Sequence, residues 1–557
     1  MGSSVPTLRG RAVVVVVQSR AVSGDDDLDY VVIGSGFGGS VSALRLAEKG
    51  YKVTVLEAGK RWKQEDFPQT NWSIKKFLWL PKLGCHGIQR ITLLDDVMVL
   101  SGAGVGGGSL VYANTLLVPP DHAFANAGWP AGKDWKAALE PHYATAKRML
   151  GAAEVPTDFP ADLLLKRAAE QIGKGDTYRR QTVGVYFEGA GDPKDPYFGG
   201  KGPARTPCNY CGGCMVGCRF GAKNTLDRNY LYLAEKLGVT IVPETLAEEI
   251  RQNSDGTFEI DTHRSTGRGG KKTYRARRVI VSAGVLGTLK LLLESKRRGG
   301  LKNLSGALGR FVRTNSEAII GVTARHDDVD YSKGVAIASS IHIDDHTHVE
   351  AVRYSRGSDA MGRLATLLAD GGGGMPRAVK WMGQVVRHPI DFLRTLNPFG
   401  WARRSVILLV MQVLESSLDI KLGKRWWWPF SDRLISSRPA DQPKIPTYIP
   451  QANEFARQVA KLQGGFPASA INEVLLDVPT TAHILGGCPI GQTPQEGVID
   501  TKNEAYGHPG LFVIDGSMVP SNLGVNPSLT ITALAEHAMS QVAPKAGATV
   551  IEAEVRA

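Results

Sequence analysis

The sequence predicts an α/β protein with more than one domain, and three observations support this prediction. The chain has 557 residues, whereas an ordinary domain has roughly 100 to 200. Its 43% hydrophobic and 22% charged residues are typical of a globular protein with a large core. Near the start, a β-rich run, a glycine-rich turn and a helical pattern follow one another, which is the order of elements in an α/β unit.

That strand, turn and helix follow one another without interruption. Residues 29–33 are β-rich, residues 34–39 read GSGFGG, and residues 40–49 keep helical spacing. A second strand at 52–56 ends at Glu57, at about the distance where an acidic residue meets a ribose hydroxyl. This context predicts a dinucleotide site of the Rossmann type.

The glycines of this turn have separate physical roles. Gly34 allows the tight turn, Gly36 lets the backbone approach a pyrophosphate, and Gly39 permits close helix packing. The following helix would present its N-terminal N–H groups and positive dipole end to the phosphates. The motif does not distinguish NAD from FAD.

The N-terminal residues 1–27 are expected to form an irregular extension. Their valine-rich run at 12–17 and the apolar run at 406–411 are much shorter than the roughly 18 residues that span a bilayer. We therefore expect no transmembrane helix, and a cytoplasmic protein rather than a secreted one. The net charge of +12 favours anionic surfaces, but no nucleic-acid motif accompanies it, so no nucleic-acid partner is expected.

Four of the six cysteines share one loop with the spacing CxxCxxCxxxC: Cys208, Cys211, Cys214 and Cys218. Bacterial ferredoxins use this spacing for iron–sulfur clusters. Four thiolates also suit one zinc ion in a closed tetrahedral site. Free thiols, or a disulfide in a turn of small residues, are the remaining alternatives.

Four further segments resemble, in order, those of the glucose–methanol–choline (GMC) flavoprotein oxidoreductases, and in particular their cholesterol oxidase-like branch. They are residues 101–110, 279–292, 483–491 and 511–538. Within that branch, the mycobacterial type resembles this chain in the cysteine loop and in the stretch RTNSE at 313–317. The resemblance implies FAD as the cofactor, and a GMC fold in which a mixed or antiparallel sheet of a substrate domain covers the flavin.

The resemblance also implies three catalytic residues. His483 would hydrogen-bond the substrate hydroxyl and assist proton removal while a hydride passes to flavin N5, and Asn526 would orient the same oxygen. Glu350 would move a proton that converts a Δ5 steroid ketone to the Δ4 ketone. Read without the family, Asn526 caps a helix at 528–538 that begins behind Pro527.

The residues that the resemblance places around the flavin come from the two glycine loops and from later segments. They are Gly34, Gly36, Phe37, Gly38, Gly39, Glu57, Gly107, Gly108, Ser109, Asn114, Ala247, Asp515, Gly516 and Asn526. The FAD-binding domain is accordingly expected to be discontinuous, made of residues 28–125, 205–300 and 475–545. Residues 126–204 and 301–474 would form the substrate-binding domain.

Two stretches mix aromatic and basic residues in the manner of an interfacial element: residues 376–405 and 424–430. A sterol is almost insoluble in water, so an enzyme that uses it must collect it at a bilayer. We therefore expect docking on a membrane surface; core or subunit contacts are the alternative explanation for these tryptophans.

The resemblance thus implies FAD-dependent oxidation of a bulky alicyclic secondary alcohol, most of all a 3β-hydroxysteroid, to its ketone, with oxygen or an electron carrier as acceptor. One alternative is a GMC dehydrogenase that oxidises another alcohol and passes its electrons to a carrier. The other is an electron-transfer or metal-binding flavoprotein in which the cysteine loop is the working part.

Overall fold

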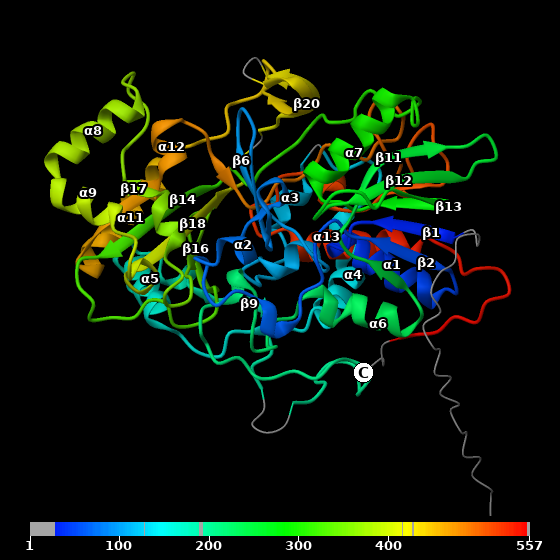
Figure 1. Cartoon of the computed structure of the whole chain (residues 1–557). Helices are drawn as coiled ribbons and strands as arrows, with labels where there is room; N and C mark the ends of the chain where they lie inside the picture. Colours follow the sequence, from blue (N-terminus) through cyan, green and yellow to red (C-terminus); the bar gives the residue numbers. More distant parts are fainter. Residues whose placement is uncertain (1–27, 127, 189–192, 415, 426–427, 554–557) are drawn as a thin grey trace, which may run out of the picture.

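The computed structural model describes residues 28–553 except 127, 189–192, 415 and 426–427 (Figure 1). The prediction for residues 1–27, and the interfacial prediction as far as it concerns the side chains of residues 425–430, lie outside what the structure describes. Among the described residues, no helix has the length and apolar character needed to cross a bilayer.

The first of two large sheets has seven strands and contains the predicted nucleotide unit. Its main path runs β10-β2-β1-β13-β12-β11, with β23 also paired to β13. The strands parallel to one another are β1 (Leu28–Ile33), β2 (Val53–Leu56), β10 (Thr240–Val242), β13 (Lys272–Val281) and β23 (Leu511–Val513). β11 (Thr245–Gln252) and β12 (Phe258–Arg264) join in antiparallel fashion. Every residue of β1 and β2 is buried, as expected for strands covered on both faces.

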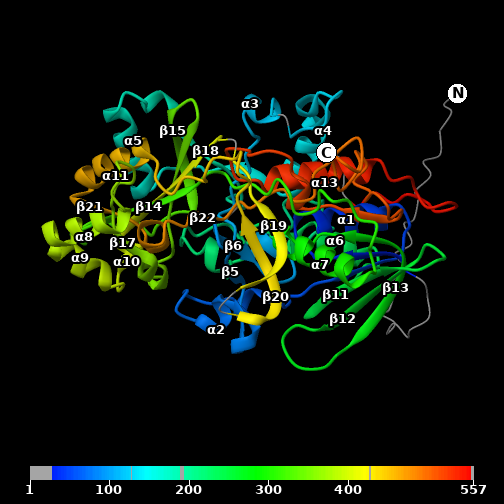
Figure 2. The same cartoon turned by 90° about the horizontal axis from the view of Figure 1, so that it is seen from above.

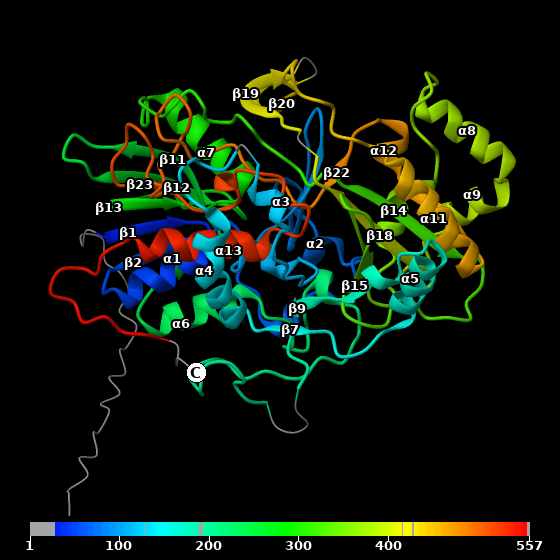
Figure 3. The ribbon, with the colours of Figure 1, turned by 180° about the vertical axis from the view of Figure 1, so that it is seen from behind.

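Helices from distant parts of the chain pack together beside this sheet (Figures 1 and 3). α1 (Phe37–Glu48) lies against α13 (Ser528–Ser540) and α6 (Tyr230–Lys236), and α13 lies against α4 (Trp135–Met149). α7 (Val285–Arg298) contacts β11. α1 begins at Phe37, directly after its N-cap Gly36, and so starts earlier than position 40, where the spacing predicts the helix to begin.

The second large sheet is antiparallel throughout. Its order is β17 (Ala365–Leu367), β21 (Gly465–Ala470), β14 (Ala318–Ala324), β18 (Ser405–Gln412), β16 (Thr347–Val352), β15 (Ile337–Asp344) and β8 (Arg179–Arg180). α5 (Pro160–Gln171) and α11 (Pro450–Gln463) cover it and share its core. A parallel nucleotide unit beside an antiparallel sheet confirms the predicted fold class.

A small three-stranded sheet lies between the two large ones (Figures 2 and 3). It consists of β5 (Gln89–Leu93), β6 (Met98–Gly102) and β22 (Thr480–Thr481), and β22 also contacts β14. β19 (Asp419–Arg425) and β20 (Trp428–Ser437) form a separate hairpin. The remaining elements are α2 (Ile74–Phe77), α3 (Asp121–Phe124), α8 (Arg377–Arg387), α9 (Pro389–Leu396), α10 (Trp401–Arg404), α12 (Ile471–Leu475), β3 (Trp79–Leu80), β4 (Cys85–His86), β7 (Ala152–Glu154) and β9 (Thr182–Gly184).

Candidate active site

The first glycine turn has one position that protein packing does not require to be glycine. Gly34 has φ +101°, and a Cβ there would lie 2.1 Å from the carbonyl oxygen of Ser282. A Cβ on Gly39 would lie 2.0 Å from the carbonyl oxygen of Gly34, whereas a Cβ on Gly36 would meet nothing within 4 Å. Gly36 is the N-cap of α1, which has no side-chain cap and no acidic residue in its first turn. The open space at this helix N-terminus fits an anionic pyrophosphate.

Glu57 and the second glycine loop are joined to this turn through Ser35. Glu57 Oε2 accepts hydrogen bonds from Ser35 N (3.0 Å) and Ser35 Oγ (2.7 Å). Ser35 Oγ in turn accepts from Gly106 N at 3.0 Å. A Cβ on Gly107 would lie 2.7 Å from Gly36 Cα, so the two glycine loops are in direct contact. The carboxylate predicted to meet a ribose is therefore fixed beside the turn predicted to hold the phosphates.

Gly36→Ala is expected to weaken FAD binding without unfolding the protein, because the added methyl enters space that only the cofactor would occupy. We expect roughly 10-fold weaker binding, the effect of about 1.4 kcal/mol. The ratio of flavin to protein absorbance measures the bound cofactor, and a melting curve of the apoprotein measures the fold. Gly38→Ala is the contrasting variant, since its Cβ would lie 1.8 Å from Ile514 O and should destabilise the fold itself.

Two carboxylates from the antiparallel sheet, a histidine beside the small three-stranded sheet and an amide before α13 come together. Glu317 immediately precedes β14, Glu350 lies within β16, His483 follows β22, and Asn526 precedes α13. All four are buried: Glu350 is 0% exposed, Glu317 1%, Asn526 7% and His483 9%. The structure therefore brings together the three predicted catalytic residues and adds a fourth.

Glu317 fixes the orientation of the His483 ring. Its Oε1 lies 2.7 Å from His483 Nδ1 and accepts from Thr481 Oγ1 at 2.9 Å, and its Oε2 accepts from Ala482 N at 3.0 Å. Because an ionised carboxylate only accepts, we assign the ring proton to Nδ1. In the neutral ring, Nε2 then carries no proton and can accept one; it lies 3.4 Å from Asn526 Nδ2.

Asn526 links the histidine to the second carboxylate. Its Nδ2 donates to Glu350 Oε2 at 3.2 Å and lies beside His483 Nε2. Asn526 Oδ1 and Glu350 Oε1 are buried and have no hydrogen-bond partner among the described residues. Such atoms are costly to leave unsatisfied. They fit a site completed by a polar group of a bound ligand.

The surroundings raise the pKa values of Glu350 and His483. Burial raises the pKa of Glu350 to about 7, against smaller opposing effects of Asn526 and His483. Burial acts to lower the pKa of His483, but the carboxylates of Glu317 and Glu350 outweigh it, so the pKa lies above its usual value. A base and an acid with displaced pKa values, at one buried point, are typical of a catalytic centre.

Asn526 does not cap a helix, which corrects the prediction. Pro527 is the N-cap of α13, the cap has no side-chain hydrogen bond, and the helix ends at Ser540. The Asn526 amide instead turns to Glu350, the contact described above. The N-terminus of α13 is thereby left without a side-chain partner at the predicted flavin.

The Asp515–Gly516 turn is tied to the neighbouring elements. Asp515 accepts from Ser517 N (2.8 Å) and Thr288 Oγ1 (2.5 Å), which connects β23 to α7. Gly486 N donates to Gly516 O at 2.9 Å, which holds the loop of His483 against this turn.

The other residues assigned to the flavin lie around these loops. Asn114 is 0% exposed with φ 74°, and its Oδ1 has no hydrogen-bond partner among the described residues. Ser109 is also buried, but its hydroxyl is used within the protein, donating to Gly106 O and accepting from Leu226 N. The Phe37 ring lies 3.7 Å from where a Cβ on Gly108 would be. Ala247 lies on β11 and packs against the hydrophobic core.

The sequence prediction missed Glu317. The residue stands in the stretch RTNSE, which resembles the mycobacterial type, but its role depends on a contact across 166 positions of the chain. No local spacing signals such a pair.

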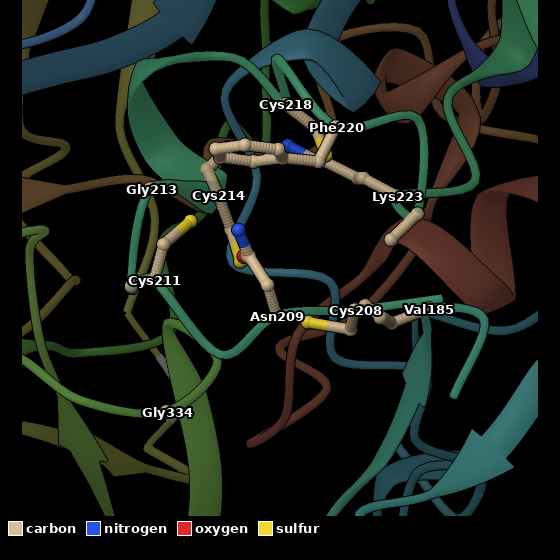
Figure 4. A pocket seen from close by; sticks show the side chains of 12 residues that line it. Val185, Cys208, Asn209, Cys211, Gly213, Cys214, Cys218, Phe220, Lys223 and Gly334 are labelled. Atoms are coloured by element: carbon tan, nitrogen blue, oxygen red, sulfur yellow. The ribbon is translucent and has the colours of Figure 1, made fainter. Parts of the chain in front are cut away.

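The four clustered cysteines line one pocket together with Asn209, Phe220 and Lys223 (Figure 4). All six cysteines of the chain are described, and none forms a disulfide, so that alternative is wrong. Among the described residues, no three His, Cys, Asp or Glu side chains have the spacing to hold a single metal ion. The zinc alternative therefore has no geometric support here, and the iron–sulfur cluster stays a prediction that rests on the thiol donor set.

Sequence comparisons match the chain to one family along most of its length. Two profiles described as GMC oxidoreductase match residues 204–310 and 438–535, and a profile described as NAD(P)-binding Rossmann-like domain matches residues 32–62. A cholesterol oxidase from Acinetobacter baumannii is 47% identical over 532 residues, covering 93% of this chain and 95% of that protein. A cholesterol oxidase from Mycobacterium tuberculosis (strain ATCC 25618 / H37Rv) is 48% identical over 533 residues, covering 92% and 91%.

More distant proteins share the fold. A long-chain-alcohol oxidase from Arabidopsis thaliana is 27% identical over 548 residues, covering 91% of this chain and 66% of that protein. The crystal structure of a pyridoxine 4-oxidase from Mesorbium loti superposes with a TM-score of 0.62 at 15% identity, covering 92% and 99% of the two chains. A formate oxidase from Aspergillus oryzae gives 0.59 at 14% identity, covering 93% and 98%.

Proposed function

Because the chain belongs to the GMC oxidoreductases, in their cholesterol oxidase branch, we propose that it oxidises a 3β-hydroxysteroid to the corresponding ketone. It is an FAD-dependent oxidoreductase acting on CH–OH groups. One observation carries the proposal: the buried ring of His483 places Nδ1 2.7 Å from Glu317 Oε1 and Nε2 3.4 Å from Asn526 Nδ2.

The chain's own residues account for the proton in this reaction. The alcohol loses its hydroxyl proton to His483 Nε2, and Asn526 Nδ2 donates to the same oxygen. The positive charge that forms on the imidazole is stabilised by Glu317, which accepts from Nδ1 at 2.7 Å. All three side chains are buried, which limits the access of water to the transferred proton.

FAD fits the residues that would hold it. Its phosphates would lie in the open space at Gly36, its ribose at the carboxylate of Glu57, and its flavin at Asn114 Oδ1, which has no hydrogen-bond partner among the described residues. Bound there, FAD would supply the acceptor for the hydride of the carbinol carbon, and so for the two electrons of the oxidation.

We further propose that Glu350 carries out the Δ5 to Δ4 isomerisation of the ketone. Its pKa of about 7 makes it a base that can both take and return a proton near neutral pH. Its Oε1 is unpartnered among the described residues and therefore available to the steroid.

The test is anaerobic reduction of the purified, FAD-loaded protein. Addition of a 3β-hydroxysteroid is expected to remove the visible flavin absorption, whereas its 3α epimer and long-chain primary alcohols should leave it. Reduction by the primary alcohols but not by the steroid would support the alternative of a GMC dehydrogenase for another alcohol. Absence of reduction by every alcohol would support the electron-transfer alternative.

The electron acceptor is oxygen or a carrier. An iron–sulfur cluster in the four-cysteine pocket would favour a carrier. If it holds an iron–sulfur cluster, protein purified without air should contain iron and show a broad shoulder in addition to the two visible flavin bands. Cys211→Ser with Cys214→Ser should remove the iron and the shoulder but leave the flavin. Flavin bands without iron in the parent protein would end the cluster prediction.

We propose a cytoplasmic location, peripheral to the membrane. Six free cysteines suit a reducing compartment. Fractionation of cells that produce the full-length protein tests this, and recovery outside the cytoplasmic and membrane fractions would contradict it.

A further inference from the structure

α8 and α9 form the end of the molecule that lies farthest from the nucleotide sheet (Figures 1 and 3). Both helices contact β17, the edge strand of the antiparallel sheet. Glu350 lies on β16 of that same sheet. The two helices therefore pack on the sheet that carries part of the active site.

One side of these helices is anchored to the protein. Arg377 is buried and donates to the carbonyl oxygens of Ala369 (2.8 Å) and Thr447 (2.6 Å). Trp381 Nε1 donates to Thr366 Oγ1 at 2.9 Å, and the Trp381 ring packs edge-on against Phe392 with centroids 5.8 Å apart. The inner face thus has its own aromatic and polar contacts.

The opposite side is apolar and exposed. Single exposed hydrophobic residues are ordinary, but a continuous patch marks an interaction site. Val386 is 80% exposed, so its side chain contributes little apolar burial to the stability of the fold. We call this surface the α8–α9 apolar face; its residues are Met375, Val379, Met382, Val386, Ile390, Leu393, Leu396 and Phe399, each 50% exposed or more.

A neighbouring segment, residues 72–83, contacts this face and contains α2 and β3. Trp72, its first residue, stacks on Phe399 with ring centroids 5.9 Å apart. Within the segment, Leu83 is 75% exposed and Ile74 43%.

The exposed charged side chains of residues 371–400 and of the segment 72–83 are all basic. They are Arg387, at the end of α8, and Lys75, Lys76 and Lys82. The segment 72–83 contains no acidic residue, and residues 371–400 contain one, Asp391. Asp391 is buried and paired with Arg325 and Arg394, at 2.7 and 2.8 Å. An apolar face bordered by cations complements an anionic lipid surface.

We propose that the α8–α9 apolar face docks on the surface of an anionic phospholipid bilayer. The apolar side chains would enter the boundary between headgroups and acyl chains, and the surrounding cations would meet lipid phosphates. A second copy of the chain is a poorer occupant, because pairing two such faces would bring like charges together. The proposal rests on the proposed function only for its purpose, since a sterol is found in the bilayer.

The test measures binding and not turnover. The full-length, FAD-loaded protein is sedimented with sterol-free vesicles of phosphatidylcholine and phosphatidylglycerol. The variant Met382→Ser/Val386→Ser/Ile390→Ser/Leu393→Ser is expected to lower the partition coefficient about 100-fold or more, as a loss of about 0.8 kcal/mol for each buried methylene implies. Binding of the parent should weaken in high salt and on vesicles of phosphatidylcholine alone.

The matched control removes exposed leucines elsewhere. Leu163, Leu246 and Leu476 are 47%, 38% and 62% exposed, and their replacement by Ser should leave vesicle binding unchanged. Both variants should keep the parent's melting temperature and its oxidation of detergent-dispersed steroid. Equal binding of parent and variant, or a parent dimer that only the α8–α9 variant dissociates, would overturn the proposal. Loss of steroid oxidation in the parent with retained vesicle binding would count against the proposed function alone.

Discussion

Replacing Glu317 by Gln is expected to lower kcat roughly 100- to 1000-fold while FAD stays bound, which is within the range for loss of acid–base assistance. The charge of Glu317 stabilises the imidazolium that forms when His483 takes the substrate proton. Glutamine has almost the same shape, but it carries no charge. It can also present its NH₂ group to Nδ1 and so favour the wrong ring tautomer.

The same variant should shift the pH profile. Because Glu317 raises the pKa of His483, and only the neutral ring can accept a proton, activity should rise with pH through that pKa. Without the Glu317 charge, the pKa falls and the rising limb moves to lower pH. A steady-state profile of kcat/KM for parent and variant measures this shift, which a merely structural role of Glu317 would not produce.

Glu473→Gln is the matched control for Glu317. Glu473 is another wholly buried carboxylate, it accepts from Ile319 N in β14, and it has no contact with His483 among its described hydrogen bonds. Burial raises its pKa to about 8, so the change to Gln is electrically small near neutral pH. If both variants lower kcat equally and neither moves the pH limb, Glu317 is not the partner of His483 in catalysis.

The fold could be predicted from sequence where its signals are local. Residues 29–33, the turn GSGFGG and Glu57 lie within one unit of the chain, and the structure places them as a strand, a helix N-terminus and a strand end. The antiparallel sheet came only from the resemblance, because its seven strands are dispersed between residues 179 and 470. No periodicity reports pairings of such separation.

The candidate active site, too, could be predicted only where its residues lie in recognisable local motifs. His483 and Asn526 were found through motifs, since each stands in a segment that resembles the family. Glu317 was not found in this way, because its role depends on the contact between its carboxylate and the His483 ring, which only the folded structure shows. Asn526 was assigned two roles, and the structure supports the one at the site: a side chain can cap a helix or face Glu350, and here it faces Glu350.

Glu350→Gln is expected to separate the two proposed reactions. Steroid oxidation should continue with at most a modest loss, because a glutamine oxygen can still accept from Asn526 Nδ2 as Glu350 Oε2 does. Isomerisation should fall roughly 1000-fold, since an amide cannot take up a proton near neutral pH. Chromatography of the products should then reveal the Δ5 ketone in place of the Δ4 ketone.

The parent's isomerisation should depend on pH in a defined direction. The carboxylate is the base, and burial raises the pKa of Glu350 to about 7. The rate should therefore increase from about pH 6 to about pH 8, whereas His483 limits oxidation by its own, separate pKa. An isomerisation rate independent of pH over this range, or Δ4 ketone formed undiminished by Glu350→Gln, would assign the step to another residue.

The same substitution should reveal what this base costs the fold. The pKa of Glu350 rises from 4.5 in the unfolded chain to about 7 in the folded protein, so the unfolded state ionises first as pH increases. The contribution of Glu350 to the free energy of unfolding is fully present below pH 4.5. It decreases as the pH rises to 7, by about 3 kcal/mol at most. Glu350→Gln removes that dependence. Urea titration measures the unfolding free energy of both proteins. The value for the variant minus that for the parent should increase between pH 4.5 and 7 by up to that amount. An equal pH dependence in both proteins would show that Glu350 is ionised in the folded state well below neutral pH.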